Sequence, residues 1–280
     1  MPWNKDRITA LLLQAGDMAL QLRRTISWER KSDRSLVTEA DRKIEAFLTG
    51  EIEDPGAGIY LIGEETVNEK GEDYLSAALQ REAFVIDPID GTSPYAHGMP
   101  HWGVSIGRMV NGELVDGAVY LPQFQEIVMS DGDAVLQGTL VEGSWRWEEL
   151  GDAERDLDGA RLVAITQGLA KRGRVTLPNS IMVLGAAVVP LIGLLQRRFC
   201  GYLGNVKLWD VAGALPLLLK KKFEVSIYPD GDRREVSAVV EDRIYDLNPG
   251  SPSRWALKSD LMVCHPDDES RFRDAFRYVG

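Results

Sequence analysis

The hexapeptide at residues 87–92, DPIDGT, restricts the fold more than any other segment of this chain. It follows an apolar run that is typical of a buried strand, and Pro88 forces Asp87 into an extended conformation at the strand end. Asp87 and Asp90 can then converge across a tight turn, where two unpaired carboxylates would repel each other. Gly91 permits a sharp turn or the close approach of a ligand to the backbone. The segment therefore predicts a strand that ends in a loop built around two acidic side chains.

The acidic pair indicates a metal site. A divalent cation would remove the repulsion between the two carboxylates, and hard carboxylate and backbone oxygens suit magnesium. If a helix begins at Thr92, its free N–H groups and its dipole form a site for an anion. Two further acidic elements add to the pair, namely Glu64-Glu65 after Gly63, and Asp210 at the start of a helix. A metal pair beside a helix N-terminus is what hydrolysis of a phosphate ester requires.

Hydrophobic periodicity predicts a mixture of helices and antiparallel strands. Apolar residues at helical spacing indicate a first helix over 8–22, and Thr38 with Asp41 forms a capping box for a second. Asn111-Gly112 and residues 131–133 indicate two hairpins. Ser180 is the expected N-cap of a helix over 180–197. The remaining predicted elements are strands over 59–62, 83–87, 161–165, 235–240 and 261–264, a helix over 210–222 and a terminal helix from 266 that includes Phe272, Phe276 and Val279. The sequence thus predicts an α+β fold in layers.

The chain is long enough to form two hydrophobic cores, with 280 residues of which 44% are hydrophobic. The acidic and polar segment at 148–159 is the best boundary between them. We therefore expect an N-terminal α+β domain over 1–150 with most of the metal ligands and the phosphate loop. A C-terminal α/β domain over 151–280 would supply the last ligand.

Charge and composition exclude several classes of function. Acids outnumber bases 43 to 32, which gives a net charge of −11 and argues against a nucleic-acid polymer or an anionic membrane as the partner. Cys200 and Cys264 show no metal or disulfide spacing, and we expect both to be buried. The longest apolar stretch, 181–195, is too short for a membrane span. The first residues lack the pattern of a signal peptide, so the expected compartment is the cytoplasm.

Four segments together resemble the inositol monophosphatase family of metal-dependent, lithium-sensitive phosphatases. They are LVTEAD at 36–41, GEE at 63–65, DPIDGT at 87–92 and WDVAG at 209–213, in the family's order and spacing. The resemblance spans nearly the whole chain. It implies an αβαβα sandwich of the sugar-phosphatase type with mixed and antiparallel sheets, a site between the two halves, and a homodimer.

The resemblance also implies a role for each site residue. Glu64, Asp87 and the carbonyl of Ile89 would hold the first magnesium, and Asp87, Asp90 and Asp210 the second. Glu64 would help to hold a weaker third ion.

The substrate phosphate would rest on the backbone of Asp90, Gly91 and Thr92. Thr92, paired with Asp41, would orient the attacking water. Glu65 would be an acid that lies behind the metal ligands without binding the metal itself. The implied reaction is direct in-line hydrolysis of a small phosphorylated metabolite by a water molecule that the metal activates.

Several positions depart from the family pattern. Ser93-Pro94-Tyr95 replaces an asparagine-phenylalanine pair, although Pro94 is tolerated in a helix's first turn. Leu203 stands where inositol-specific members have a glutamate that contacts sugar hydroxyls, which argues against myo-inositol phosphate as the best substrate. The lysines at 220–222 replace an acidic and glycine-rich helix end, and we interpret them as a solvated helix terminus.

Other basic residues leave the substrate open. Lys171, Arg172 and Arg174 could bind a second phosphate or form an exposed loop, and Lys31 aligns with a lysine near the family's metals. His97 and His101 are interpreted as surface or rim residues because Pro100 breaks their helical register.

The alternatives to an inositol monophosphatase are a 3′(2′),5′-bisphosphate nucleotidase, a fructose-1,6-bisphosphatase and a histidinol phosphatase. Outside the enzymes, the alternative is a regulatory protein that keeps the fold without turnover.

Overall fold

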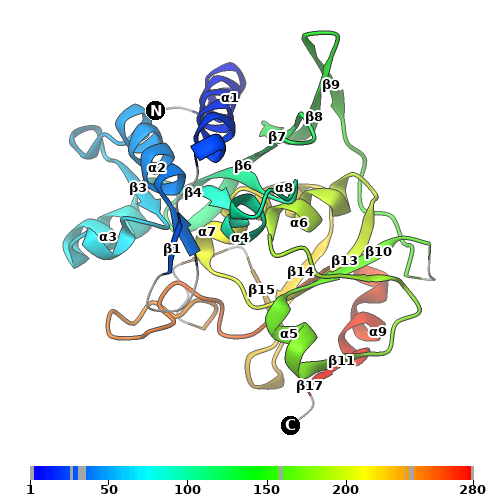
Figure 1. Cartoon of the computed structure of the whole chain (residues 1–280). Helices are drawn as coiled ribbons and strands as arrows, with labels where there is room; N and C mark the ends of the chain where they lie inside the picture. The colour runs from blue at the N-terminus through cyan, green and yellow to red at the C-terminus, as the bar shows by residue number, and fades with distance from the viewer. Residues whose placement is uncertain are drawn as a thin grey trace.

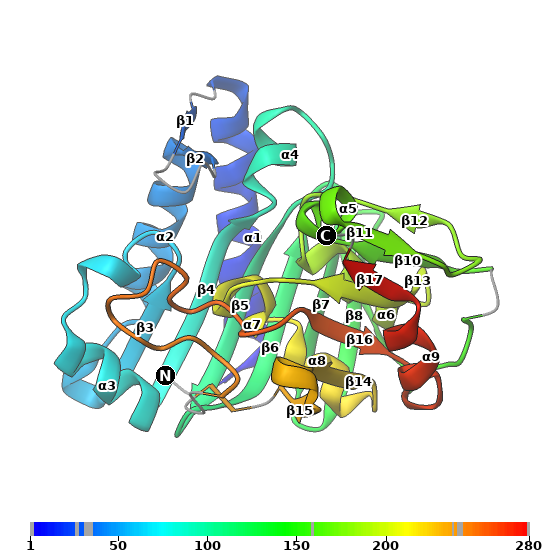
Figure 2. The same ribbon diagram turned by 90° about the horizontal axis from the view of Figure 1, so that it is seen from below.

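Helices and sheets alternate in five layers in the computed structural model of the chain (Figures 1 and 2). The structure describes residues 3–25, 28–30, 36–157, 160–236, 238–239 and 243–278. Lys31 and Val279 lie outside the described residues. The layered α+β sandwich with mixed and antiparallel sheets that the sequence predicts is confirmed.

The larger sheet has seven strands in the order β3-β4-β5-β6-β7-β8-β9. Only β3 and β4 are parallel, and every later neighbour in this sheet is antiparallel. The strands are β3 (Ile59–Gly63), β4 (Glu82–Asp90), β5 (Gly103–Val110), β6 (Glu113–Leu121), β7 (Glu126–Asp131), β8 (Ala134–Val141) and β9 (Ser144–Glu149). The β8–β9 hairpin extends beyond the body of the molecule at the top of Figure 1.

The second sheet has six strands in the order β12-β10-β13-β16-β14-β15. They are β10 (Leu162–Ile165), β12 (Ile181–Met182), β13 (Phe199–Gly204), β14 (Glu224–Ile227), β15 (Arg234–Glu235) and β16 (Leu261–Cys264). Two small ribbons pair β1 (Trp28–Arg30) with β2 (Leu36–Thr38), and β11 (Gly173–Val175) with β17 (Phe276–Tyr278).

Three hydrophobic clusters separate the layers. Helices α1 (Lys5–Leu22) and α2 (Glu39–Ile52) cover one face of the larger sheet. The helices between its other face and the second sheet are α6 (Val188–Leu195), α7 (Leu208–Ala212) and α8 (Leu215–Lys220), and α3 (Glu72–Gln80) packs at the margin of the same cluster. Helices α5 (Gln167–Arg172) and α9 (Glu269–Asp274) cover the outer face of the second sheet.

The short elements complete the chain. Helix α4 (Thr92–Ala96) follows β4 directly. The 3₁₀ helices are η1 (Arg23–Thr25), η2 (Pro55–Ala57), η3 (Val67–Glu69), η4 (Pro229–Gly231) and η5 (Pro266–Asp268). No helix among the described residues is long and apolar enough to cross a membrane.

The sequence predicts the first part of the chain well. Helix α2 begins at the expected capping box, in which Thr38 and Asp41 bond each other's backbone. Asn111 and Gly112 both have positive φ, 52° and 79°, as a tight hairpin turn between β5 and β6 demands. The turn at 131–133 likewise joins β7 to β8. One strand differs, because β4 does not stop before Pro88 but continues to Asp90.

The second part requires larger corrections. The predicted helix over 180–197 is wrong in its first half, since β12 occupies Ile181–Met182 and α6 begins only at Val188. The predicted helix over 210–222 is broken into α7 and α8 around Gly213. The predicted terminal helix ends at Asp274, and Phe276 lies in β17 instead. Strands β9, β13 and β14 are additions that the sequence patterns do not reveal.

One hydrophobic cluster contains residues from both sides of the predicted boundary at residue 150. It joins Val85 and Val119 of the larger sheet to Leu191 of α6 and Val263 of the second sheet. Two lysines at the end of α8 bind acids on the other side of that residue, Lys220 with Asp116 and Lys221 with Glu149, while Lys222 pairs with Asp152 just after it. Lys220 and Lys221 thus attach α8 to the larger sheet, and the boundary at 150 remains a prediction.

Candidate active site

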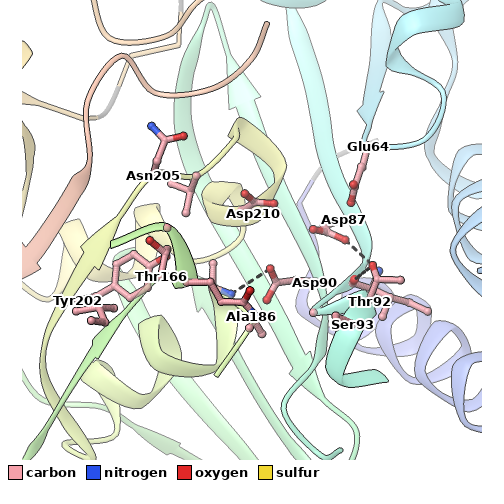
Figure 3. Close-up of a pocket in the computed structure, with 18 of the residues that line it drawn as sticks. Glu64, Asp87, Asp90, Thr92, Ser93, Thr166, Ala186, Tyr202, Asn205 and Asp210 are labelled. Carbon is pink, nitrogen blue, oxygen red and sulfur yellow. Dashed lines mark hydrogen bonds between the residues drawn. The ribbon is translucent and has the colours of Figure 1, made fainter. Parts of the chain in front are cut away.

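A cavity of about 560 Å³ lies at the carboxyl end of β4, between the larger sheet and the second sheet. In Figure 3, the side chains of Glu64, Asp87, Asp90 and Asp210 point toward one shared space. The cavity is lined by Glu64, Asp87, Ile89, Asp90, Gly91, Thr92, Ser93, His97, Ile165, Thr166, Gln167, Gly168, Gly185, Ala186, Ala187, Tyr202, Asn205, Val206 and Asp210.

A β-bulge brings Asp87 and Asp90 to the same face of the sheet. Along β4, Phe84 and Ile86 face α1 and α2, while Val85 faces the middle helices. Strict alternation would send Asp87 and Asp90 to opposite faces. However, Asp87 pairs with Ser105 and Asp90 with Gly103, so three steps on β4 oppose two on β5. The extra residue restores a common direction, as a bulge beside a functional site commonly does.

Strand register places Glu64 next to this pair. Strands β3 and β4 are parallel and pair Gly63 with Ile86, so Glu64 leaves β3 at the level where Asp87 follows on β4. The two parallel strands therefore place Glu64 and Asp87 side by side at one edge of the sheet. This explains why residues 23 positions apart meet without a direct sequence signal.

Asp210 arrives from the opposite side on α7. The helix can approach the larger sheet because Gly107 has no side chain, and a Cβ there would lie 2.4 Å from the carbonyl oxygen of Ala212. Within α7, Asp210 turns back to accept a hydrogen bond from the N–H of Lys207 at 2.7 Å. This close packing of helix on strand sets Asp210 against the β4 acids.

Three of the acids form a compact group. Ligand oxygens of Asp87, Asp90 and Asp210 all lie within 4.8 Å of one another, and Asp87 and Asp90 are almost fully buried. Burial raises the pKa of Asp87 well above its usual value, and the charges of Glu64 and Asp90 add to the effect. Burial and the charge of Asp210 do the same to the pKa of Asp90. Such a set is costly for the protein alone and fits a hard divalent cation.

Asp90 also caps helix α6. Its two carboxylate oxygens accept hydrogen bonds from the N–H groups of Ala187 at 3.1 Å and Val188 at 2.9 Å. Figure 3 marks a bond from Asp90 to this segment with a dashed line. An N-cap side chain usually precedes its helix directly, but here it comes from 97 residues earlier in the chain. The acid group is thereby linked to the first turn of a helix in the second part of the chain.

Asp41 connects the start of α2 to Thr92. Its Oδ1 accepts a hydrogen bond from the Thr92 hydroxyl at 3.1 Å, while its Oδ2 accepts from the N–H of Thr38 at 2.8 Å. Asp41 is fully buried, which raises its pKa, and the hydrogen bonds from Thr38 act in the opposite direction. The Thr92 hydroxyl also lies 3.2 Å from the carbonyl oxygen of Ile89. Asp41 therefore serves both as a capping acid and as the partner of a cavity residue.

The loop after Asp90 turns at Gly91, whose φ is 90°. A side chain there would clash with the carbonyl of His101 at 2.7 Å. Helix α4 begins at Thr92 with Pro94 in its first turn, so the departure at Ser93-Pro94-Tyr95 leaves the helix in place. Tyr95 is buried and its hydroxyl donates to the carbonyl of Ala19 at 2.7 Å.

The structure separates several residues that the sequence grouped with the site. Leu203 belongs to the outer cluster of the second sheet and lines a different cavity, of about 200 Å³. Its neighbour Tyr202 lines the acidic cavity instead. In the basic segment, Gln167 and Gly168 line the acidic cavity, whereas Lys171, Arg172 and Arg174 are exposed and do not.

The predicted place at the rim holds for His97, whereas His101 does not line the cavity. His97 is exposed and lines the cavity, with its Nδ1 2.8 Å from the carbonyl oxygen of Ser93. The ring of His101 is 6.5 Å from that of Phe124. Neither histidine belongs to the acid group found among the described residues.

Several residues at the site are not found by the sequence analysis, among them Glu45 and Tyr202. Glu45 of α2 is fully buried and accepts hydrogen bonds from the N–H groups of Glu65 and Thr66. A polar residue one turn after Asp41 on an otherwise apolar helix face is the signal that could have found it. Tyr202 gave no such signal, because an aromatic residue in a strand is ordinary.

Comparison with known proteins agrees with these observations. The family model described as "Inositol monophosphatase family" matches residues 7–219. The chain is 28% identical over 200 residues to an inositol-1-monophosphatase of Rhizobium meliloti, covering 67% of this chain and 70% of that protein. It is 37% identical over 123 residues to inositol monophosphatase 1 of Sus scrofa, covering 42% of this chain and 43% of that protein, which is less than half of the relative's length.

Among solved structures, the fold is similar to that of the extragenic suppressor protein suhB of Bartonella henselae. The TM-score is 0.69 at 18% identity, and the alignment covers 96% of each chain.

Proposed function

The chain belongs to the inositol monophosphatase family, and we propose from this premise that it hydrolyses a small phosphate monoester in a magnesium-dependent reaction. The observation that carries the proposal is the meeting of Asp87, Asp90 and Asp210 within 4.8 Å. Carboxylates at this separation, two of them buried, are unfavourable without a cation. Their convergence on a cavity, and not on a packed interior, supports a catalytic use of that cation.

The donor set assigns the metal ligands in this proposal. Glu64, Asp87 and the carbonyl of Ile89 would hold one Mg²⁺, and Asp87, Asp90 and Asp210 a second, with Glu64 also near a weaker third. Bound Mg²⁺ would offset the charge of the cluster, activate a water molecule as nucleophile and stabilise the charge that develops on the leaving oxygen.

The chain's own residues would position the attacking water. The Thr92 hydroxyl has one proton and two nearby acceptors, Asp41 at 3.1 Å and the Ile89 carbonyl at 3.2 Å. When that proton points to Asp41, the lone pairs of the Thr92 oxygen are free to accept a hydrogen bond from water. Because Asp41 is fixed by Thr38, the direction of the Thr92 hydroxyl is fixed as well. The pair would thus orient a water molecule beside the acid group.

The cavity limits the size and polarity of the substrate. Its volume suits a small metabolite, and the substrate phosphate would rest on the backbone of Asp90, Gly91 and Thr92. The far wall is polar, with Thr166, Asn205 and Tyr202 (Figure 3). Within the described part of the chain, the buried Tyr202 hydroxyl has no hydrogen-bond partner.

Release of inorganic phosphate tests the proposal. The panel should contain inositol monophosphates, 3′,5′-bisphosphate nucleotides, fructose 1,6-bisphosphate and histidinol phosphate, each assayed with and without Mg²⁺. We expect magnesium-dependent release from at least one compound, and inhibition of that release by lithium or calcium. The exposure of Lys171, Arg172 and Arg174 outside the cavity gives no added support to a bisphosphate.

A panel without magnesium-dependent release would overturn the enzymatic proposal. It would favour the alternative of a regulatory protein that keeps the fold. The presence of all the proposed ligand carboxylates argues against that alternative.

A further inference from the structure

Helix α2 carries a second buried acid one turn after Asp41. Glu45 is 0% exposed, and its carboxylate accepts two backbone hydrogen bonds, from the N–H of Glu65 at 2.9 Å and from that of Thr66 at 2.8 Å. Each bond uses a different oxygen of the carboxylate. Glu45 therefore fixes the turn after β3 at two successive peptide groups.

The space around this contact is closely fitted. A Cβ on Gly63 would lie 2.4 Å from the carboxyl carbon of Glu45, which no real side chain tolerates without movement. Gly63 thus lets the carboxylate lie directly against the strand end. The residue between this close contact and the two bonded peptide groups is Glu64.

Asp41 and Glu45 act on two different sides of the cavity. They are four residues apart and so lie on the same face of α2. Asp41 binds Thr92 at the start of α4, and Glu45 binds the turn that carries Glu64. One helix face thereby holds both the hydroxyl and the carboxylate that the proposed reaction uses.

We propose that Glu45 is a positioning residue for the metal site, which holds the turn after β3 so that Glu64 faces Asp87. The proposal rests on the function proposed above and adds a residue that does not touch the metal or the substrate. A buried carboxylate is expensive for a fold, and a turn needs no ionised group to close it. Two charge-assisted bonds on successive N–H groups fix the turn in position and direction, which a metal ligand requires.

The test compares two variants that disturb the contact in different ways. Glu45→Gln keeps the length of the side chain but turns an amide N–H₂ toward a backbone N–H. Gly63→Ala keeps every charge and pushes the Glu45 carboxylate away. Glu53→Gln is the matched control, because Glu53 binds Lys70 and Tyr74 in the same region, and Glu53 does not line the cavity.

The readout is the half-saturating Mg²⁺ concentration from isothermal titration calorimetry, measured beside the Mg²⁺ dependence of phosphate release. We expect Glu45→Gln and Gly63→Ala to raise this concentration about 10-fold. Saturating Mg²⁺ should restore most of the turnover number. Glu53→Gln should lower the melting temperature and leave the half-saturating concentration within about 2-fold of the parent. Its partners Lys70 and Tyr74 do not hold a metal ligand in place.

Each outcome discriminates. Unchanged half-saturation in both site variants, with a normal magnesium response in the parent, would overturn the positioning role alone. A change of the half-saturating concentration in Glu45→Gln but not in Gly63→Ala would mean that only the charge of Glu45 matters. That result would also overturn the positioning role. A parent protein that neither responds to Mg²⁺ nor releases phosphate would overturn the proposed function, and this inference with it.

Discussion

Helices α2 and α6 both start beside the acidic cavity, and an aspartate fixes the start of each. In α2 the aspartate is local, since Asp41 and Thr38 bond each other's backbone within the first turn. In α6 it is Asp90, which reaches the N–H groups of Ala187 and Val188 from the end of β4. The start of α2 can be predicted from four adjacent residues, whereas the start of α6 depends on a residue from the other part of the chain.

The difference concerns function as well as folding. The α2 cap lies one hydrogen bond away from the cavity, through Thr92. The α6 cap is itself a member of the acid group. A change at Asp90 should therefore affect the chemistry and the helix together, while a change at Thr38 should affect mainly the helix.

The largest expected effect is that of Asp90→Asn. The amide keeps the volume but loses the charge of a proposed metal ligand, so phosphate release should fall by at least about 100-fold. It also turns an N–H₂ group toward α6, and one lost hydrogen bond of about 1 kcal/mol should speed amide exchange at Val188 roughly five-fold. Phosphate assays and hydrogen exchange measure the two effects. Asp131→Asn, at an exposed turn, is the control, and near-normal release in Asp90→Asn would refute the ligand assignment.

An intermediate effect should appear in the pH dependence of magnesium stabilisation. Burial, with neighbouring charges, raises the pKa of Asp87 and Asp90 above the unfolded value. The folded protein then binds protons more tightly than the unfolded chain, so without metal it loses stability as pH rises above about 4.

Magnesium should reverse this loss. At about 100 times its Kd it should contribute about 2.7 kcal/mol. Its effect on the melting temperature should be larger at neutral pH than near pH 5, where more of the cluster is protonated. Thermal melts at both pH values measure it, and an equal shift at both would contradict the assigned pKa directions.

The smallest expected effect compares Thr38→Ala with Ser180→Ala. Loss of the Thr38 cap should cost about 1 kcal/mol of unfolding free energy. Ser180 is exposed and precedes α6 by several residues, so its replacement should change stability by less than about 0.5 kcal/mol. Urea denaturation of both variants gives the values. A cost at Ser180 equal to that at Thr38 would mean that α6 starts where the sequence predicted.

The same contrast between local and distant partners decides which elements the sequence predicts. Local signals were sufficient for α1, for the start of α2 and for the hairpin at Asn111-Gly112, because the residues that decide each element are adjacent. Ser180, the cap that the sequence predicts, precedes α6 by several residues. The true cap lies outside any local window, and the break between α7 and α8 reflects packing of Gly213 on the larger sheet.

The site residues were predictable only as a set of separate motifs. Their roles came from family resemblance, and the reason they meet is three-dimensional. The bulge in β4 turns Asp87 and Asp90 to one face, although Pro88 in the sequence indicated a strand end. Parallel register places Glu64 beside them. No motif marks Glu45, because its partners are backbone groups that any sequence possesses, and its only signal is its place as a polar residue on an apolar helix face.

The cap that Asp90 supplies to α6 has a kinetic consequence. A helix that is completed by a residue 97 positions earlier cannot gain that contact until a long loop of chain has closed, and such contacts slow folding. The first turn of α6 should therefore become ordered late in folding, after the β4 bulge has formed. During synthesis, β4 leaves the ribosome well before α6, so the acceptor for the helix is in place before the helix itself is made.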